Sequence, residues 1–216
     1  AILGQMLEAS GGAEAIAEHL LKKFKGNKAS WAMVLTGFII AIPVYFDVGF
    51  IILVPIIYAL SRETKKSLLF YGIPLLAGLA VTHSYIPPTP GPVAVAEILD
   101  ARLGWLIIFG VIVGVPTAII AGPIFGKHIS KKIHLKPPDY FVNEESSEKR
   151  PEQKPAFSTI VGIIALPLVL IVLNTISNAL YKQGILQNEQ LYKLFTFIGH
   201  PFFALTVSTL LAFYVL

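Results

Sequence analysis

The sequence contains no cysteine, which excludes thiol catalysis, disulfide bonds and cysteine-based metal sites. Charged residues are also scarce, at 14% of the chain against about 25% in an average soluble domain. The 216 residues contain no Walker A loop, dinucleotide fingerprint, HExxH sequence or Ser-His-Asp order. These absences argue against an enzyme and against an ATP-driven pump on this chain.

Apolar residues dominate instead. They form 55% of the chain, the mean hydropathy is +0.71, and runs long enough to span a bilayer recur. The sequence therefore predicts an all-α polytopic membrane protein surrounded by lipid. The net charge of +4 does not indicate a nucleic-acid partner, because the lysines lie beside apolar runs. The chain begins at Ala1 and ends inside an apolar run, so we expect a piece of a longer protein.

The most informative stretch is a polar, proline-rich interruption inside the apolar residues 67–99, with four prolines between positions 87 and 92. Proline lacks an N–H donor and disfavours helix in the residue before it, so we expect no helix through this segment. Unwound backbone at membrane depth is tolerated only where it lines a cavity, and broken helices mark substrate sites in transporters. We therefore predict a broken helix over 67–99 that supplies half of a solute-binding site.

Residues 29–60 form another apolar run, and Asp47 is its only charge. The sequence IPVYFDVG at 42–49 divides this run into halves of about 13 residues, each roughly 20 Å long as helix. Each half is too short for a hydrocarbon core of about 30 Å. The run is either one long tilted helix or a re-entrant hairpin with its tip at Tyr45-Phe46-Asp47.

The distribution of positive charge favours the hairpin. With 29–60 re-entrant and 67–99 crossing, 14 of the 17 Lys and Arg residues fall on one side. If both stretches cross, the split is 7 against 10, and if only 67–99 is re-entrant it is 11 against 6. The predicted topology continues with a span at 103–126, a cytoplasmic charged loop at 127–155, and spans at 156–181 and 194–216. Gly110, Gly114 and Gly122 are expected to allow close helix packing in the first of these spans.

Two titratable groups inside apolar runs are the candidates for chemistry. A carboxylate such as Asp47 is costly inside a membrane unless it is paired, protonated or hydrated, so it indicates a proton relay, a cation ligand or a substrate contact. The alternative is an N-cap that accepts the N–H groups of Gly49 and Phe50. His83 is a candidate proton carrier or hydrogen-bond donor, or alternatively a structural residue that caps the preceding half-helix.

Hydroxyl and backbone groups around the break complete the expected site. The half-helix after Gly91 should present free N–H groups and the positive end of its dipole, which favours a bound carboxylate near residues 91–93. Thr82, Ser84 and Thr89 offer hydroxyls for a hydroxy-acid. His128, His134 and His200 do not form a metal-binding pattern, and we expect no metal site.

Three phrases resemble the gluconate permease family of proton symporters, within the broader ion-transporter superfamily. They are LGQMLEASGGAEAIAEHLL at 3–21, VYFDVGFIILVPIIYAL at 44–60 and, most specifically, THSYIPPTPGPVAVA at 82–96. The resemblance covers nearly the whole chain, and family members are about twice this length. It implies an elevator-type transporter in which inverted repeats each supply a re-entrant hairpin and a broken helix. The first repeat would occupy 1–126, and the start of the second 156–216.

The resemblance also implies proton-coupled uptake of gluconate or a related sugar acid across the cytoplasmic membrane, driven by the proton gradient without a cofactor. Thr89 departs from the family, since many gluconate permeases have His there, which leaves glycerate, lactate-like substrates and cation coupling open. A non-transporting scaffold subunit and an intramembrane enzyme are the alternatives from other classes, and a homo-oligomer is compatible with the sequence.

Asp47 and His83 are the expected coupling groups. The expected substrate-binding residues are Phe46, Asp47, Thr82, His83, Ser84, Pro88, Thr89, Pro90 and Gly91.

Overall fold

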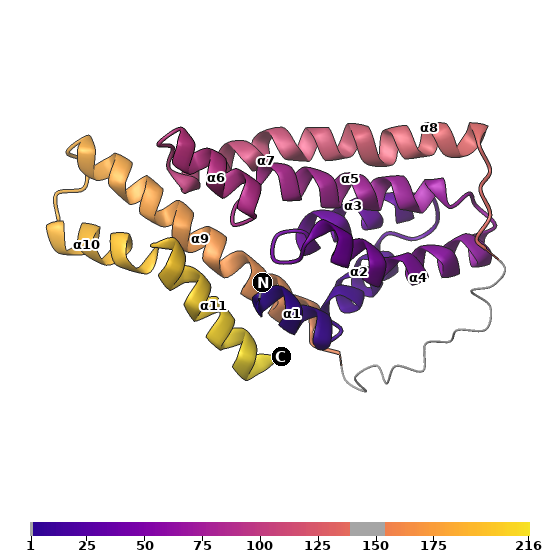
Figure 1. The fold of residues 1–216 in the computed structure, drawn as a ribbon, viewed down its shortest axis with the longest axis horizontal. Coiled ribbons are helices and arrows are strands. Elements are labelled where there is room, and N and C mark those ends of the chain that lie inside the picture. Colours follow the sequence, from indigo (N-terminus) through magenta and orange to yellow (C-terminus); the bar gives the residue numbers. More distant parts are fainter. Residues whose placement is uncertain (1, 139–153) are drawn as a thin grey trace.

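The computed structural model describes residues 2–138 and 154–216, and every regular element in these ranges is helical (Figure 1). The N-terminal elements are α1 (Ile2–Ala9), α2 (Gly12–Lys23), η1 (Gly26–Lys28), α3 (Ala29–Ile40), α4 (Phe46–Thr64), α5 (Leu69–Tyr85) and α6 (Pro90–Ile98). They are followed by α7 (Leu103–Ile119), η2 (Ile120–Ile124), α8 (Phe125–Lys132), α9 (Phe157–Lys182), α10 (Glu189–Ile198) and α11 (Pro201–Val215). The polytopic all-α class is confirmed at this level.

The run at 29–60 consists of two helices, α3 and α4, separated by residues 41–45. The chain leaves one end of the molecule in α3 and returns to the same end in α4. A hydrogen bond shows this: the Lys66 ammonium, after α4, donates to the Asn27 side chain, before α3, at 2.7 Å. Both helices pack against α5. One long tilted helix is therefore ruled out, and the geometry is that of a hairpin. Membrane sidedness remains a prediction.

The proline-rich break is shorter than expected. Only residues 86–89 lie outside the helices, because α6 already begins at Pro90. Proline is compatible with a first helical turn, whose N–H groups have no partner within the helix. The helix is interrupted at residues 86–89, and the half-helix expected after Gly91 already begins at Pro90.

Helices α7, η2 and α8 form one continuous rod of 30 residues. The helix runs six residues past the predicted end at 126, and η2 is a π-helical turn with Pro123 inside it. Small residues at every fourth position are buried against neighbouring helices: Gly110, Gly114, Ala118, Gly122 and Gly126. A Cβ atom added at any glycine of this row would contact residues of α5. The predicted close packing of this span is confirmed.

The last three helices lie along one side of the molecule, where α9 packs against both α10 and α11 (Figure 1). The break between α10 and α11 at 199–200 bends the pair by 60°. In the described ranges, the helical stretches long and apolar enough to cross a membrane are Leu69–Ile98, Leu103–Lys132 and Phe157–Lys182, with α10 and α11 as a fourth if they form one span. Neither α3 nor α4 is among them.

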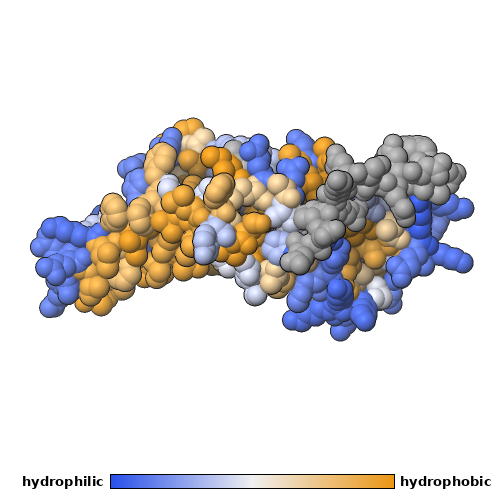
Figure 2. Space-filling view, turned by 90° about the horizontal axis from the view of Figure 1, so that it is seen from below, coloured by the Kyte–Doolittle hydropathy of each residue, from blue (hydrophilic) through white to orange (hydrophobic). Residues whose placement is uncertain are grey.

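Cations from three stretches of sequence meet at one end of the molecule, which we call the basic end. Residues 133–138, which we call the strap, run from α8 across the start of α5. The Ser67 hydroxyl donates to the carbonyl of Ile133 at 2.9 Å, and Arg62 donates to the carbonyl of Pro138 at 2.8 Å. The cations of the basic end are Lys22, Lys23, Lys25, Lys28, Arg62, Lys65, Lys66, Lys127, Lys131, Lys132 and Lys136. Figure 2 shows hydrophilic residues towards both ends and a hydrophobic band between them.

Candidate functional site

Close packing of α3 on α5 brings the two breaks together. A Cβ at Gly37 would lie 2.5 Å from the carbonyl oxygen of Leu75, and one at Gly78 would overlap the carbonyl oxygen of Val34. Both positions therefore require glycine for backbone-to-backbone contact. The Thr82 hydroxyl, fully buried, donates to the carbonyl of Phe38 at 3.0 Å. Since α3 ends just before residues 41–45 and α5 just before residues 86–89, this packing places one break beside the other.

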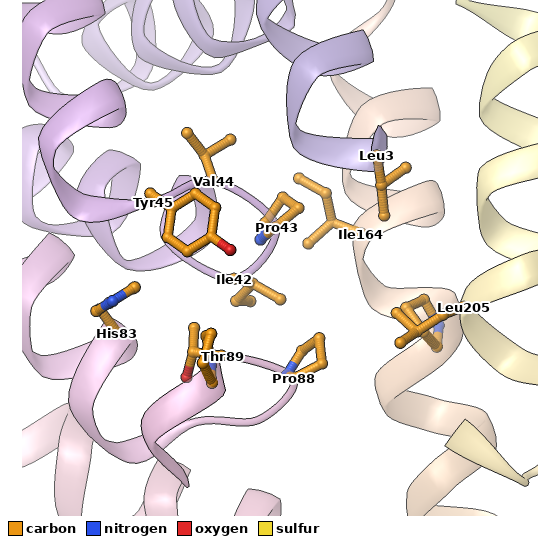
Figure 3. A pocket seen from close by; sticks show the side chains of 12 residues that line it. Leu3, Ile42, Pro43, Val44, Tyr45, His83, Pro88, Thr89, Ile164 and Leu205 are labelled. Carbon is orange, nitrogen blue, oxygen red and sulfur yellow. The ribbon is translucent and has the colours of Figure 1, made fainter. Parts of the chain in front are cut away.

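A cavity of about 130 Å³ lies between these breaks (Figure 3). We call it the hairpin cavity. Its walls come from both breaks and from α1, α9 and α11: Leu3, Ile42, Pro43, Val44, Tyr45, His83, Pro88, Thr89, Pro90, Ile164, Pro167 and Leu205.

His83 and Tyr45 form the polar side of the hairpin cavity. Their ring centroids are 6.0 Å apart with the planes tilted by 60°, and Figure 3 shows the two rings on the same side of the space. The Nδ1 atom of His83 is buried and has no hydrogen-bond partner in the structure. The predicted capping alternative is not observed, because neither ring nitrogen of His83, in the last turn of α5, donates to a carbonyl of another described residue. Leaving a buried ring nitrogen without a hydrogen-bond partner is unfavourable. Either a functional role of this nitrogen or a bound water molecule would account for it.

Thr89 shapes the loop that closes the other side. It is buried, and its hydroxyl donates to the carbonyl of Ile86 at 2.8 Å, which ties residues 86–89 into a compact turn. The Pro87–Pro88 peptide bond in this turn is cis. The hydroxyl oxygen of Thr89 can still accept a hydrogen bond from a solute.

A second, more open cavity of about 810 Å³ lies on the opposite face of the broken helix, between α6 and α7; we call it the α7 cavity. Ser84 and Gly91 line this cavity, whereas Pro88, Thr89 and Pro90 line the hairpin cavity. His83 lines both. The predicted residues of the broken helix thus do not form one surface, and His83 lies in the wall between two compartments.

We expected Phe46 and Asp47, at the hairpin tip, to contact solute directly, but neither residue lines either cavity. Asp47 is exposed in the first turn of α4, its carboxylate makes no hydrogen bond or ion pair with another described residue, and it lines neither cavity. Phe46 packs against the main hydrophobic core. The N-cap alternative for Asp47 was wrong: Tyr45 occupies that position, and its carbonyl accepts the N–H of Gly49 at 2.9 Å.

The start of α6 offers fewer donors than expected for an anion. Pro90 and Pro92 have no N–H, and the N–H of Val93 donates to the carbonyl of Thr89 at 3.2 Å. Gly91 supplies the remaining N–H of this first turn, and nothing lies within 4 Å of the position its Cβ would take. The expected contact over residues 91–93 therefore reduces to Gly91 and the helix dipole.

Several lining residues were not anticipated from the sequence. Tyr45 directly precedes Phe46 and Asp47, the residues that were predicted to bind substrate, so its polar aromatic side chain could have been included from the sequence. Leu3, Ile164 and Leu205 belong to distant helices, and nothing local in their sequence marks them. In the part of the chain that the structure describes, no group of three His, Asp or Glu side chains could hold a metal ion.

Comparison with known proteins identifies the family. The model of the GntP family permeases matches residues 1–216. The chain belongs to the GntP permease family. GntP relatives include gluconate permeases of Pseudomonas aeruginosa, 36% identical over 99% of this chain and 46% of the relative, and of Bacillus subtilis, 37% identical over 99% and 48%. An L-idonate transporter of Escherichia coli is 31% identical over 100% of this chain and 48% of its own length.

This chain spans about half the length of the curated GntP relatives it matches. No solved structure matches it. The members of this family are permeases, a class of membrane transport proteins. The two groups that the enzyme alternative would need, Asp47 and His83, do not face one cavity.

Proposed function

We propose that the protein containing this chain is a secondary transporter for gluconate or a closely related sugar acid in the bacterial inner membrane. The observation that carries the proposal is the cavity between two helix breaks, one at residues 41–45 and one at 86–89. Paired breaks at membrane depth are the arrangement in which transporters bind solutes. The names of the relatives, gluconate permeases and an L-idonate transporter, supply the substrate class.

The carboxylate of the substrate is assigned to the start of α6. Nothing lies within 4 Å of the position that a Cβ of Gly91 would take, and neither the N–H of Gly91 nor the positive end of the helix dipole needs a charged side chain to attract an anion. The substrate hydroxyls are assigned to His83 and Ser84, which line the α7 cavity together with Gly91. His83 also lines the hairpin cavity and so links the bound sugar acid to that second compartment.

Proton coupling is assigned to His83 and Asp47. The buried, unpaired Nδ1 of His83 lies between the two cavities, so a change in its protonation would be felt in both. Asp47 is exposed on this chain, and the relatives are about twice as long. We infer that the remainder of a full-length protein covers Asp47 and completes the site as a second, inverted repeat of an elevator-type transporter.

The test is uptake of labelled gluconate, with simultaneous measurement of proton entry, by the full-length protein in proteoliposomes. Asp47→Asn and His83→Ala are expected to abolish concentrative uptake while leaving counterflow of substrate measurable. If both variants still concentrate gluconate as the wild type does, the coupling assignment is wrong.

Competition by a panel of sugar acids determines the substrate. Gluconate and L-idonate are expected to compete, and lactate, which lacks the hydroxyl chain, is expected to compete weakly. Stronger competition by glycerate or lactate than by gluconate would overturn the substrate assignment while leaving transport itself intact. Absence of uptake for every acid, in a folded full-length protein, would favour the scaffold alternative.

A further inference from the structure

The basic end carries many cations that the fold does not use. Arg62 donates to the strap, and Lys66 donates to Asn27 and lies 4.4 Å from the ring centre of Phe70. The other lysines of the basic end are exposed, and their ammonium groups make no hydrogen bond or ion pair with another described residue. Of the nearby acids, Glu18 pairs with Lys154, and Glu63 is exposed at the end of α4. Within the described residues, the basic end therefore carries unpaired positive charge to which an anionic partner could bind.

The length of the α7–α8 rod places part of this charge at a defined depth. Thirty helical residues extend about 45 Å, whereas a hydrocarbon core is about 30 Å thick and is crossed by about 20 residues. With Leu103 at one interface, next to Trp105, the rod emerges near residue 123 on the other. Helix α8 begins at Phe125, so it lies at the level of the lipid head groups.

The side chains of α8 match this depth. Lys127 and Lys131 are one turn apart on the same face of the helix, and both are exposed. Ile124 and Phe125, immediately before them, are 55% and 50% exposed, as expected for residues that contact acyl chains. The strap adds Lys136 close to exposed apolar side chains, Leu135 being 50% exposed. Apolar residues followed by cations across a membrane surface are typical of contacts with anionic lipid.

We propose that the basic end binds the phosphodiester head groups of anionic phospholipids, with Lys127 and Lys131 of α8 as the principal contacts. The partner follows from charge and depth together. A soluble anion would satisfy the charge, but it would not account for the exposed apolar residues that adjoin the lysines. The lipids bound there would contact α8 and the strap, and through the strap the junction between α4 and α5.

The test measures binding of phosphatidylglycerol to the purified full-length protein in a neutral detergent, by native mass spectrometry. Each lysine near an anionic surface contributes roughly a fivefold change in affinity, so Lys127→Gln with Lys131→Gln should weaken binding by about 25-fold. The control is Lys182→Gln with Lys193→Gln, two exposed lysines at the C-terminal end of α9 and on α10, of which Lys193 pairs with Glu189 at 2.7 Å. The control is expected to bind as the wild type does, and Lys127→Arg with Lys131→Arg should retain binding.

Four results would overturn the proposal. One is equal loss of binding in the two glutamine variants, which would mean that the lysines act through general charge. The second is unchanged binding in the α8 variant, and the third is equally tight binding of zwitterionic phosphatidylcholine. The fourth is displacement of phosphatidylglycerol by millimolar inorganic phosphate, which would identify a site for the free anion. Because these lysines are exposed, unfolding midpoints of all variants should match the wild type, which confirms that each variant is folded.

Discussion

Gly78 on α5 is a position where we expect one added methyl group to be poorly tolerated. A Cβ there would overlap the carbonyl oxygen of Val34 and lie 2.8 Å from the backbone nitrogen of Phe38. Both obstacles are backbone atoms of α3, which cannot rotate aside as a side chain would. Gly78→Ala must therefore move α3 away from α5, and overpacking of this kind costs about 1–3 kcal/mol.

The same helix offers a matched control. Gly72 has nothing within 4 Å of the position its Cβ would take, so Gly72→Ala should be neutral or stabilise the helix by up to about 1 kcal/mol. Relatives of this chain are about twice its length, and for a protein of that size 1 kcal/mol moves the unfolding midpoint by about 1–2 °C. We therefore expect Gly78→Ala to unfold about 1–6 °C below the wild type, measured by thermal unfolding of the purified full-length protein.

Uptake supplies the functional part of this test. Because α3 and α5 carry the two breaks that border the hairpin cavity, Gly78→Ala should also lower the uptake rate per folded molecule, whereas Gly72→Ala should not. A Gly78→Ala protein as stable and as active as Gly72→Ala would refute the idea that backbone contact between α3 and α5 holds the breaks together.

Three further predictions concern single hydrogen bonds and the open space beside α6. Thr82→Val removes the bond to Phe38 and should cost about 1 kcal/mol of stability with KM unchanged; a raised KM at unchanged stability would instead mark Thr82 as a substrate contact. Ser67→Ala removes the acceptor of the Leu135 N–H, so hydrogen exchange at that amide should accelerate, and unchanged protection would contradict the role given to the strap. Gly91→Ala places a methyl group where we assign the substrate carboxylate, and KM should rise about tenfold, equivalent to about 1.4 kcal/mol, without loss of stability. An unaltered KM would remove Gly91 from the site.

The breaks in the helices could be predicted because their causes are local. The prolines between positions 87 and 92 predicted the interruption between α5 and α6. The sequence at 42–49, which divides the apolar run into two halves too short to cross a membrane, predicted the interruption between α3 and α4. The extent of the first break was overestimated, since Pro90 and Pro92 fit within a first helical turn. The extent of α8 was underestimated, because a lysine-rich segment was taken as loop although no glycine or proline occurs from His128 until Pro137.

The composition of the hairpin cavity could be predicted only in part. His83 and Thr89 were found because they adjoin the prolines, whereas Leu3, Ile164 and Leu205 reach the cavity through tertiary packing that leaves no local trace. Thr82 looked equivalent to Thr89 in sequence, but its position on α5 directs its hydroxyl to α3. Which face of a helix meets which neighbour decided these outcomes, and the weak amphipathicity of apolar membrane helices gives little information about it.

The π turn η2 affects the phase of the long rod. Successive residues of an α-helix are rotated by about 100°, so a row of small residues at every fourth position drifts by about 40° per step. From Gly110 to Gly126 that drift would amount to about 160° and would carry the last glycine to the far side of the rod. The wider turn at Ile120–Ile124 takes up part of this rotation, and Gly126 stays against Pro74 of α5. If the same five residues adopted α-helical geometry instead, Lys127 and Lys131 would swing around the rod axis by about a quarter of a turn.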